Sequence, residues 1–241
     1  MLVTVRGLVI RSLKYGESSL IFDLYTQEYG YASFIVGGVR KPKARMPASL
    51  FQLMNWIEVV AYIKDPSQLS RIKETRLVLN YKHIPFDMQK RGVGLFITEI
   101  VQKTIKEKEA NEQLYQFLWK TFLYLDESDA SISNMHIVFL LRLSGYLGFL
   151  PHNTNDQSAS FFNLLNGSFE KVRHPIYSLD QNTSNLLAQC LEKEIENAHT
   201  LLLARAQRKD LLQSLITFYK LHVERMPDIQ THQILAQVLN G

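Results

Sequence analysis

The stretch IVGGVRKPKARMPASLF, residues 35–51, holds the densest group of side chains in this sequence that could bind a charged ligand. Four cations, Arg40, Lys41, Lys43 and Arg45, fall within six positions behind a glycine pair. Lysine and arginine bind a polyanion chiefly by displacing its condensed counterions, and glycine lets a backbone approach phosphate closely. The stretch therefore predicts a binding site for a phosphate backbone. A solvated hairpin loop is the alternative.

The net positive charge of the chain is confined to its first third. The net charge is +4, and residues 1–80 hold 11 Lys+Arg against 6 Asp+Glu, whereas the remainder holds 16 against 17. A polyanionic partner is therefore expected on the first third. Cations of the first and fifth predicted strands would extend the field: Arg6, Arg11, Lys14, Arg71 and Arg76. Aromatic residues are interleaved with them, of which most are expected in the core and a few could stack on bases: Tyr15, Phe22, Tyr25, Tyr29, Tyr31, Phe34, Phe51, Trp56 and Tyr62.

No catalytic constellation can be assembled from the remaining motifs. Neither the dinucleotide fingerprint nor a phosphate-binding P-loop is present, and the seven histidines do not form a metal-binding pair with a carboxylate. Each histidine is interpreted as an ordinary surface or capped residue. Cys190, the only cysteine, lies in an apolar helical pattern and is expected to be a buried structural thiol. The sequence therefore predicts a protein that is not an enzyme.

The single cysteine and the absence of a membrane span or signal peptide favour a cytoplasmic protein.

The elements that must position the cations are strands within the first 80 residues. Five segments rich in β-branched and aromatic residues alternate with turn signals. They cover residues 3–13, 19–26, 31–38, 49–63 and 69–78. Five short strands with one long basic connection predict a small barrel, closed or partly open.

From about residue 86 apolar residues recur at three- and four-residue steps, which predicts helices. Asn111 is the expected N-cap of one of them, and Asn166-Gly167 is a hairpin signal. The helices are expected at 88–108, 112–126, 133–150, 183–196 and 201–224, with a short one after Pro227. The expected fold is α+β and multidomain: a barrel at 1–80, then a mainly helical domain at 81–241 with a cysteine-free β-hairpin insertion at about 151–179.

Residues 7–45 resemble the opening of RecO, a family of bacterial recombination-repair proteins. The shared elements follow in order: VIRS at the end of the first strand, the turn YGESS, then LYTQEYG, then GGVRKPKAR. The likeness is dense over residues 1–80 and looser, though colinear, to the C-terminus.

The resemblance implies an N-terminal OB-fold and a helical domain. Proteins of this kind bind single- and double-stranded DNA, promote strand annealing and act with RecR in the RecFOR pathway. Together they help RecA replace single-strand-binding protein (SSB) on single strands. The implied role is a cytoplasmic, nucleoid-associated one in DNA repair, with no membrane partner and no phosphodiester chemistry. A barrel that binds RNA or ribosomes is the alternative.

The resemblance also implies a docking site for the acidic, hydrophobic-ended tail of SSB on the helical domain. Such a tail needs an apolar groove bordered by cations. The candidates are Arg142, Arg205, Arg208 and Lys209, with a solvated helix face as the alternative.

Many family members carry a four-cysteine zinc ribbon after the third helix. Residues 151–179 contain no cysteine here, and His152 and His174 cannot complete a tetrahedral site alone. Neither zinc nor another cofactor is therefore predicted, and apolar packing is expected to hold the hairpin instead.

Overall fold

The computed structural model describes residues 2–41, 43–65, 67–152 and 160–239. Its contacts divide the chain into two compact units. The first is Met1–Phe86 with Thr98–Leu123, and the second is Asp87–Ile97 with Tyr124–Gly241.

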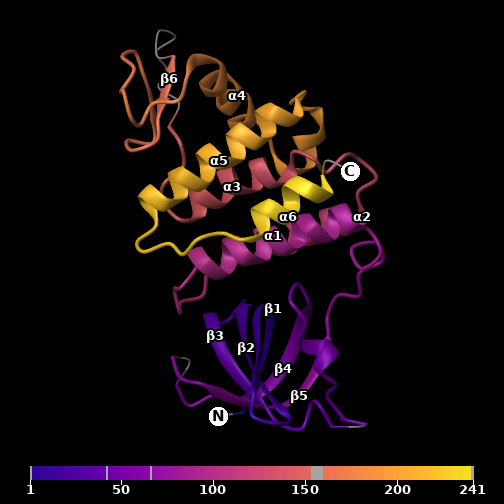
Figure 1. The fold of residues 1–241 in the computed structure, drawn as a ribbon. Coiled ribbons are helices and arrows are strands. Elements are labelled where there is room, and N and C mark those ends of the chain that lie inside the picture. The colour runs from indigo at the N-terminus through magenta and orange to yellow at the C-terminus, as the bar shows by residue number, and fades with distance from the viewer. Residues whose placement is uncertain (1, 42, 66, 153–159, 240–241) are drawn as a thin grey trace. The chain divides into compact units, whose positions relative to one another are not determined.

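The first unit is built on a closed five-stranded barrel (Figure 1). The strands are β1 (Leu2–Tyr15), β2 (Ser19–Thr26), β3 (Gly30–Val36), β4 (Trp56–Tyr62) and β5 (Ser70–Leu77). They close in the order β1-β2-β3-β5-β4, and only the β3–β5 pair is parallel. This architecture confirms the expected barrel followed by helices.

Strand alternation sends one set of apolar side chains into the barrel. The rings of Phe22, Phe34 and Phe51 meet there, with centroids 5.6 Å apart for the first two and 4.7 Å for Phe22 and Phe51. Valine, isoleucine and leucine side chains from all five strands complete this core. Burial of these rings is the main stabilisation of the barrel.

The expectation of one strand over residues 49–63 is wrong in its first half. Residues Ala48–Phe51 form the short 3₁₀ helix η1, and β4 begins only at Trp56. Phe51 is fully buried in the barrel core, and Met54 has a φ of 74°. The Asn55 amide also donates to two carbonyls of the η1 segment, at 2.9 and 3.1 Å. The β-prone composition of this segment is therefore overridden by tertiary packing, because η1 places Phe51 in the barrel core.

Trp56 points to the outside of the barrel, where aromatic residues of the same unit cover it. Its ring meets Tyr115, Trp119 and Phe122 edge-on, with centroids 5.4, 5.0 and 6.2 Å away. These residues lie on α2 (Glu112–Glu127), whose expected N-cap is confirmed, since the Asn111 side chain accepts from the Leu114 N–H at 3.0 Å. Trp56 is therefore structural and unavailable to a base.

The second unit is helical. Its elements beyond the start of α1 (Met88–Thr104) are α3 (Met135–Tyr146), α4 (Gln181–Leu191), η2 (Ile195–Thr200), α5 (Arg205–His222) and α6 (Thr231–Val238). Helix α3 is buried on nearly all sides, as its apolar sequence predicts. Helices α4 and α5 are shorter than expected. Asp180 caps α4 by accepting from Thr183 at 3.0 Å, and the η2 turn separates the two helices.

The predicted hairpin is present as β6 (Phe161–Asn163) and β7 (Ser168–Glu170), which flank Gly167 with its φ of 66°. Phe162 packs on Phe169 and on Phe218 of α5, at centroid distances of 5.1 and 5.7 Å. Leu165, an apolar residue of the hairpin segment, is exposed and takes no part in this packing. Aromatic packing holds the described part of the hairpin.

Candidate functional site

The basic stretch after β3 is anchored to the barrel. Val39 is 3 % exposed and belongs to the barrel core, so the residues beside it are fixed at the surface. The Arg40 N–H donates to the Ser18 carbonyl at 3.4 Å, which ties the stretch to the β1–β2 turn. Backbone bonds from Lys41 to Gly38 and from Ala44 to Lys41, at 3.3 and 3.2 Å, shape the rest. The described part of the stretch is therefore tied to the barrel at Val39 and Arg40.

Five of the nine cations predicted to bind nucleic acid have no side-chain partner within the described ranges. Three belong to the anchored stretch, and two lie on β1 and β5: Lys14, Arg40, Lys41, Lys43 and Arg71. All five are exposed. The guanidinium of Arg71 lies 4.0 Å from the position of a Cβ built on Gly37, where the stretch begins. The five form a positive surface at one end of the barrel, which we call the free-cation surface.

Arg6 and Arg76 lie instead on a three-strand ladder with Glu58 between them. Both Nε atoms bond to this carboxylate at 2.7 Å, and the register places the three residues side by side on β1, β4 and β5. The hydrogen bonds from Arg76 and then Arg6 lower the pKa of Glu58 to about 2. The ladder therefore keeps only one net positive charge.

Arg11 serves a buried carboxylate. Its Nε bonds to Asp23, which also accepts from the Tyr31 hydroxyl and, at 2.7 Å, from the Ser33 hydroxyl. The Asp23 side chain is fully buried, so these donors offset the cost of removing a charge from water. Burial and then the bond to Asp23 raise the pKa of Tyr31. Arg11 is thus held as part of the barrel wall.

Arg45 is an intermediate case. Its guanidinium is 3.3 Å from Glu74 of β5, and both side chains are largely exposed. Exposed pairs of this kind contribute little and are screened by salt. Arg45 is therefore easily released toward another anion.

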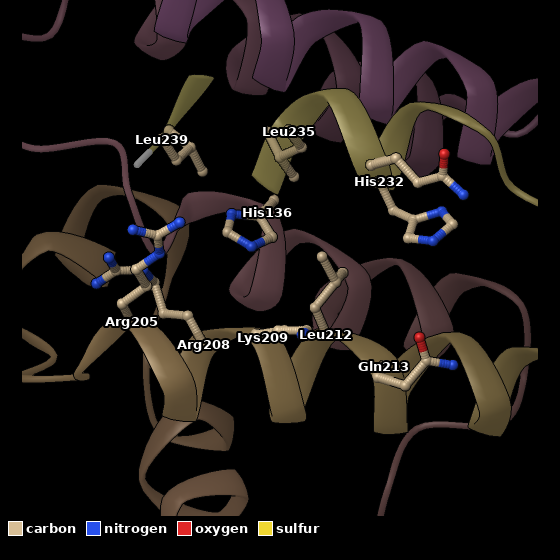
Figure 2. Close-up of a pocket in the computed structure, with 10 residues that line it drawn as sticks. His136, Arg205, Arg208, Lys209, Leu212, Gln213, His232, Leu235 and Leu239 are labelled. Carbon is tan, nitrogen blue, oxygen red and sulfur yellow. The ribbon is translucent and has the colours of Figure 1, made fainter. Parts of the chain in front are cut away.

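The second unit carries a cavity of about 210 Å³ between α5 and α6, floored by α3 (Figure 2). Arg205, Arg208 and Lys209 of α5 border it, as the sequence predicts for a docking groove. The apolar part of its wall comes from Leu212, Leu235 and Leu239. The cavity thus combines an apolar interior with a cationic rim.

Two histidines also line this cavity, although the sequence predicts them to be ordinary surface or capped residues. His136 on α3 is 2 % exposed, and its Nδ1 has no hydrogen-bond partner among the described residues. The buried Nδ1 of His232 on α6 is likewise unpartnered there. Burial, and then the charge of Arg208, lower the pKa of His136 to about 3, so the ring is neutral. The sequence holds one indication that His136 is buried, because it lies within the apolar run of α3.

Arg142, the fourth predicted docking residue, does not line the cavity. Its guanidinium donates to the carbonyls of Leu191 and Lys193, at 3.1 and 2.6 Å, and lies 3.2 Å from Glu194. The residue thus ties α3 to the end of α4 and satisfies carbonyl groups that this helix end leaves open. Its role in the described structure is internal.

Cys190 is buried, as expected, and burial raises the pKa of its thiol to about 12. Within the described ranges, no three His, Cys, Asp or Glu side chains gather as a metal site. None of the described helices is long and apolar enough to span a membrane.

The chain thus combines a closed five-stranded barrel that carries the free-cation surface with a helical unit. Two domain families match the chain. Recombination protein O N terminal matches residues 1–81, and recombination protein O C terminal matches residues 85–229. The DNA repair proteins RecO of Phocaeicola vulgatus and Bacteroides fragilis are each 31 % identical over 242 residues, covering all of both chains. RecO of Christiangramia forsetii is 30 % identical over 99 % of each chain. The chain belongs to the RecO family of DNA repair proteins.

Proposed function

We propose that this protein is a DNA-binding recombination mediator. In this proposal residues 1–80 bind single- and double-stranded DNA, and residues 81–241 dock protein partners. It promotes annealing and, with RecR, assists RecA loading onto SSB-coated single strands, without covalent chemistry, in the cytoplasm at the nucleoid. The observation that supports DNA binding most directly is the free-cation surface, which lies on β1, β5 and a stretch anchored by Val39, in a chain of the RecO family.

Free cations are the stronger phosphate ligands in this proposal because they give up no existing ion pair. A phosphate that engaged Arg6 or Arg76 would compete with Glu58, and one at Arg11 would leave the buried Asp23 uncompensated. We therefore assign primary phosphate contact to the free-cation surface. Arg45 joins it when salt or DNA displaces Glu74.

The test is fluorescence anisotropy with a labelled single strand of about 30 nucleotides over a salt series. The variant replaces Lys14, Arg40, Lys41 and Lys43 by alanine. Each phosphate contact contributes about −0.7 to the slope of log K against log salt, so the slope should flatten by about 3. The matched control replaces Arg6 and Arg76 by alanine and also carries Glu58→Gln, so that no unpaired carboxylate remains. This control should flatten the salt slope by less than half as much as the first variant does. Equal slopes in wild type and the first variant would contradict the proposal.

The RNA- or ribosome-binding alternative is separated by competition. DNA and RNA of one sequence are offered together at one salt concentration, since charge alone does not distinguish them. The proposal expects DNA to compete at least as well as RNA. A preference of about tenfold for RNA would favour the alternative.

We also propose that the α5–α6 cavity accepts the acidic, hydrophobic-ended tail of SSB. Supporting this are its cationic rim, its leucine wall and the two unpartnered ring nitrogens, which a carboxylate or backbone group of the tail would satisfy. Arg142 lies outside the cavity and is not assigned to this role.

A labelled peptide with an acidic stretch and an aromatic C-terminal residue tests this second site. Arg208→Ala and Leu212→Asp should each weaken its binding by about tenfold or more, because each removes a different part of the recognition. Lys220→Ala is the matched control, since Lys220 lies on the same helix but pairs with Asp228 away from the cavity. Equal losses in the control would mean that the peptide is held by overall charge.

A further inference from the structure

One level of the outer barrel surface carries apolar side chains on four of the five strands and an arginine on the fifth. The register joins Leu13 to Ile21, Ile21 to Ile35, Ile35 to Arg71, Arg71 to Tyr62 and Tyr62 to Leu2. The side chains of this row point outward, because their chain neighbours Phe22, Phe34 and Ala61 belong to the core. On three of the strands the next level is polar and holds Arg11, Asp23 and Ser33. The row is therefore a distinct apolar track with a single charge in it.

Tyr62 is the most prominent member of this row. It is 55 % exposed, and among the described residues no hydrogen bond or ring contact engages it. Its direct cross-strand neighbour Arg71 belongs to the free-cation surface and reaches toward Gly37. Adjacent strands are about 4.8 Å apart, so an exposed aromatic ring and an unpaired guanidinium are carried by directly neighbouring strand positions.

The chemistry of this pair fits a single-stranded nucleic acid. Each nucleotide carries a flat base and a phosphate, and stacking on an aromatic ring beside a cationic groove is the usual mode of sequence-tolerant binding. A protein partner fits less well, because protein interfaces are depleted in lysine, whereas Lys14, Lys41 and Lys43 lie on the adjoining surface. The barrel aromatics Phe22, Phe34, Phe51 and Trp56 are buried and cannot stack on a base. Tyr15 at the end of β1 is 56 % exposed, but it pairs with Ser19 outside this row and has no cross-strand arginine beside it.

We propose that Tyr62 stacks on a base of bound single-stranded DNA while Arg71 holds a neighbouring phosphate. This inference rests on the proposed DNA-binding function and assigns the base contact within it. Tyr62 supplies affinity that depends on the base and not on the number of phosphates. Salt dependence and stacking thus belong to different residues of one surface.

The experiment compares two labelled strands of equal length, oligo-dT and an abasic strand with the same phosphates, against wild type, Tyr62→Leu and Tyr62→Trp. Tyr62→Leu keeps an apolar side chain but removes the π-face. It should weaken oligo-dT binding by about tenfold, leave abasic binding unchanged and leave the salt slope unchanged. Tyr62→Trp should bind oligo-dT at least as tightly as wild type. Leu77→Ala, another exposed residue of the same sheet, is the control and should bind as wild type does.

Equal binding of oligo-dT by wild type and Tyr62→Leu would overturn the assignment. An equal loss for the abasic strand would also overturn it, since the effect would then not involve a base. Wild type that binds neither strand in a salt-dependent way would overturn the proposed function and this inference together. Retained, salt-dependent binding with an indifferent Tyr62 would overturn only the inference.

Discussion

The neutral histidine in the floor of the α5–α6 cavity should make the protein lose stability in mild acid. His136 is 2 % exposed, its ring meets Phe96 edge-on at 6.0 Å, and burial lowers its pKa to about 3. In the unfolded chain the pKa of a histidine is about 6.5. Because the unfolded state binds the proton more readily, the stabilisation is fully present above that pH. It is lost as the pH falls toward about 3.

The size of this loss follows from the two pKa values. Between pH 7.5 and pH 5.0 the unfolded state gains a proton at this site and the folded state does not, which costs about 2 kcal/mol of unfolding free energy. Urea unfolding followed by far-UV circular dichroism at the two pH values measures it. His136→Leu removes the titrating group, so the drop in the variant should be smaller by that amount. The comparison between proteins cancels the other titrating groups.

The reasoning would be refuted by equal drops in wild type and His136→Leu. Such a result would mean that His136 takes up its proton in the folded protein at an ordinary pH, which requires water or an anion at its unpartnered nitrogen. A larger drop in the variant would be equally incompatible with a neutral buried ring.

Three further predictions concern the two units separately. Asp23→Ala should lower the unfolding free energy of the barrel by about 3 kcal/mol, because it leaves the Arg11 guanidinium without its buried partner; urea unfolding followed by tryptophan fluorescence measures this, and a loss below about 1 kcal/mol would contradict it. Gly92→Ala should speed amide exchange in α6 although alanine favours helices, because the new Cβ would lie 2.6 Å from a methyl of Val238; unchanged exchange would mean that α6 shifts without cost. Cys190 should stay unreactive toward a thiol reagent at pH 8 until denaturant is added, since burial raises its pKa to about 12; rapid labelling of the native protein would show an opening that exposes α4.

The barrel was predictable because its signals are local. Strand segments with β-branched and aromatic residues end at turn residues, and the register then follows from which side chains must be inside. The segment before Trp56 could not be placed in this way. Its composition suits a strand, but in the structure Phe51 fills the barrel core from a 3₁₀ helix. The space that Phe51 fills exists only when all five strands have closed into the barrel.

The site was predictable in its residue types and not in their pairing. In the sequence Arg6, Arg11, Arg71 and Arg76 are equivalent strand cations. Cross-strand register brings a carboxylate beside three of them and leaves Arg71 free, at the edge of the basic stretch. A carboxylate far away in sequence becomes the nearest neighbour in the sheet, so charge counting cannot identify the free cations.

His136 shows the same limit in the helical unit. The apolar run of α3 predicts a buried helix, and a histidine in it predicts either a satisfied core residue or an unusual one. The choice depends on what α5 and α6 place opposite the ring, and these helices follow about 70 and 95 residues later. Only the assembled unit reveals the unpartnered nitrogen and the cavity beside it.

The placement of carboxylates gives the barrel two kinds of cation with different consequences for binding. In the proposed function, a cation already paired with Glu58 or Asp23 must give up that pair to contact a phosphate, so it adds less to salt-dependent affinity while it holds the strands in register. A free cation such as Lys41 would give up no ion pair on contacting a phosphate, and that contact would weaken when salt or another protein competes. A protein that must bind DNA and then yield it to another protein is served by contacts of the second kind. On this argument and the proposed function, converting paired cations into free ones, as Glu58→Gln does for Arg6 and Arg76, should tighten DNA binding at low salt and steepen its salt dependence, which the anisotropy salt series measures.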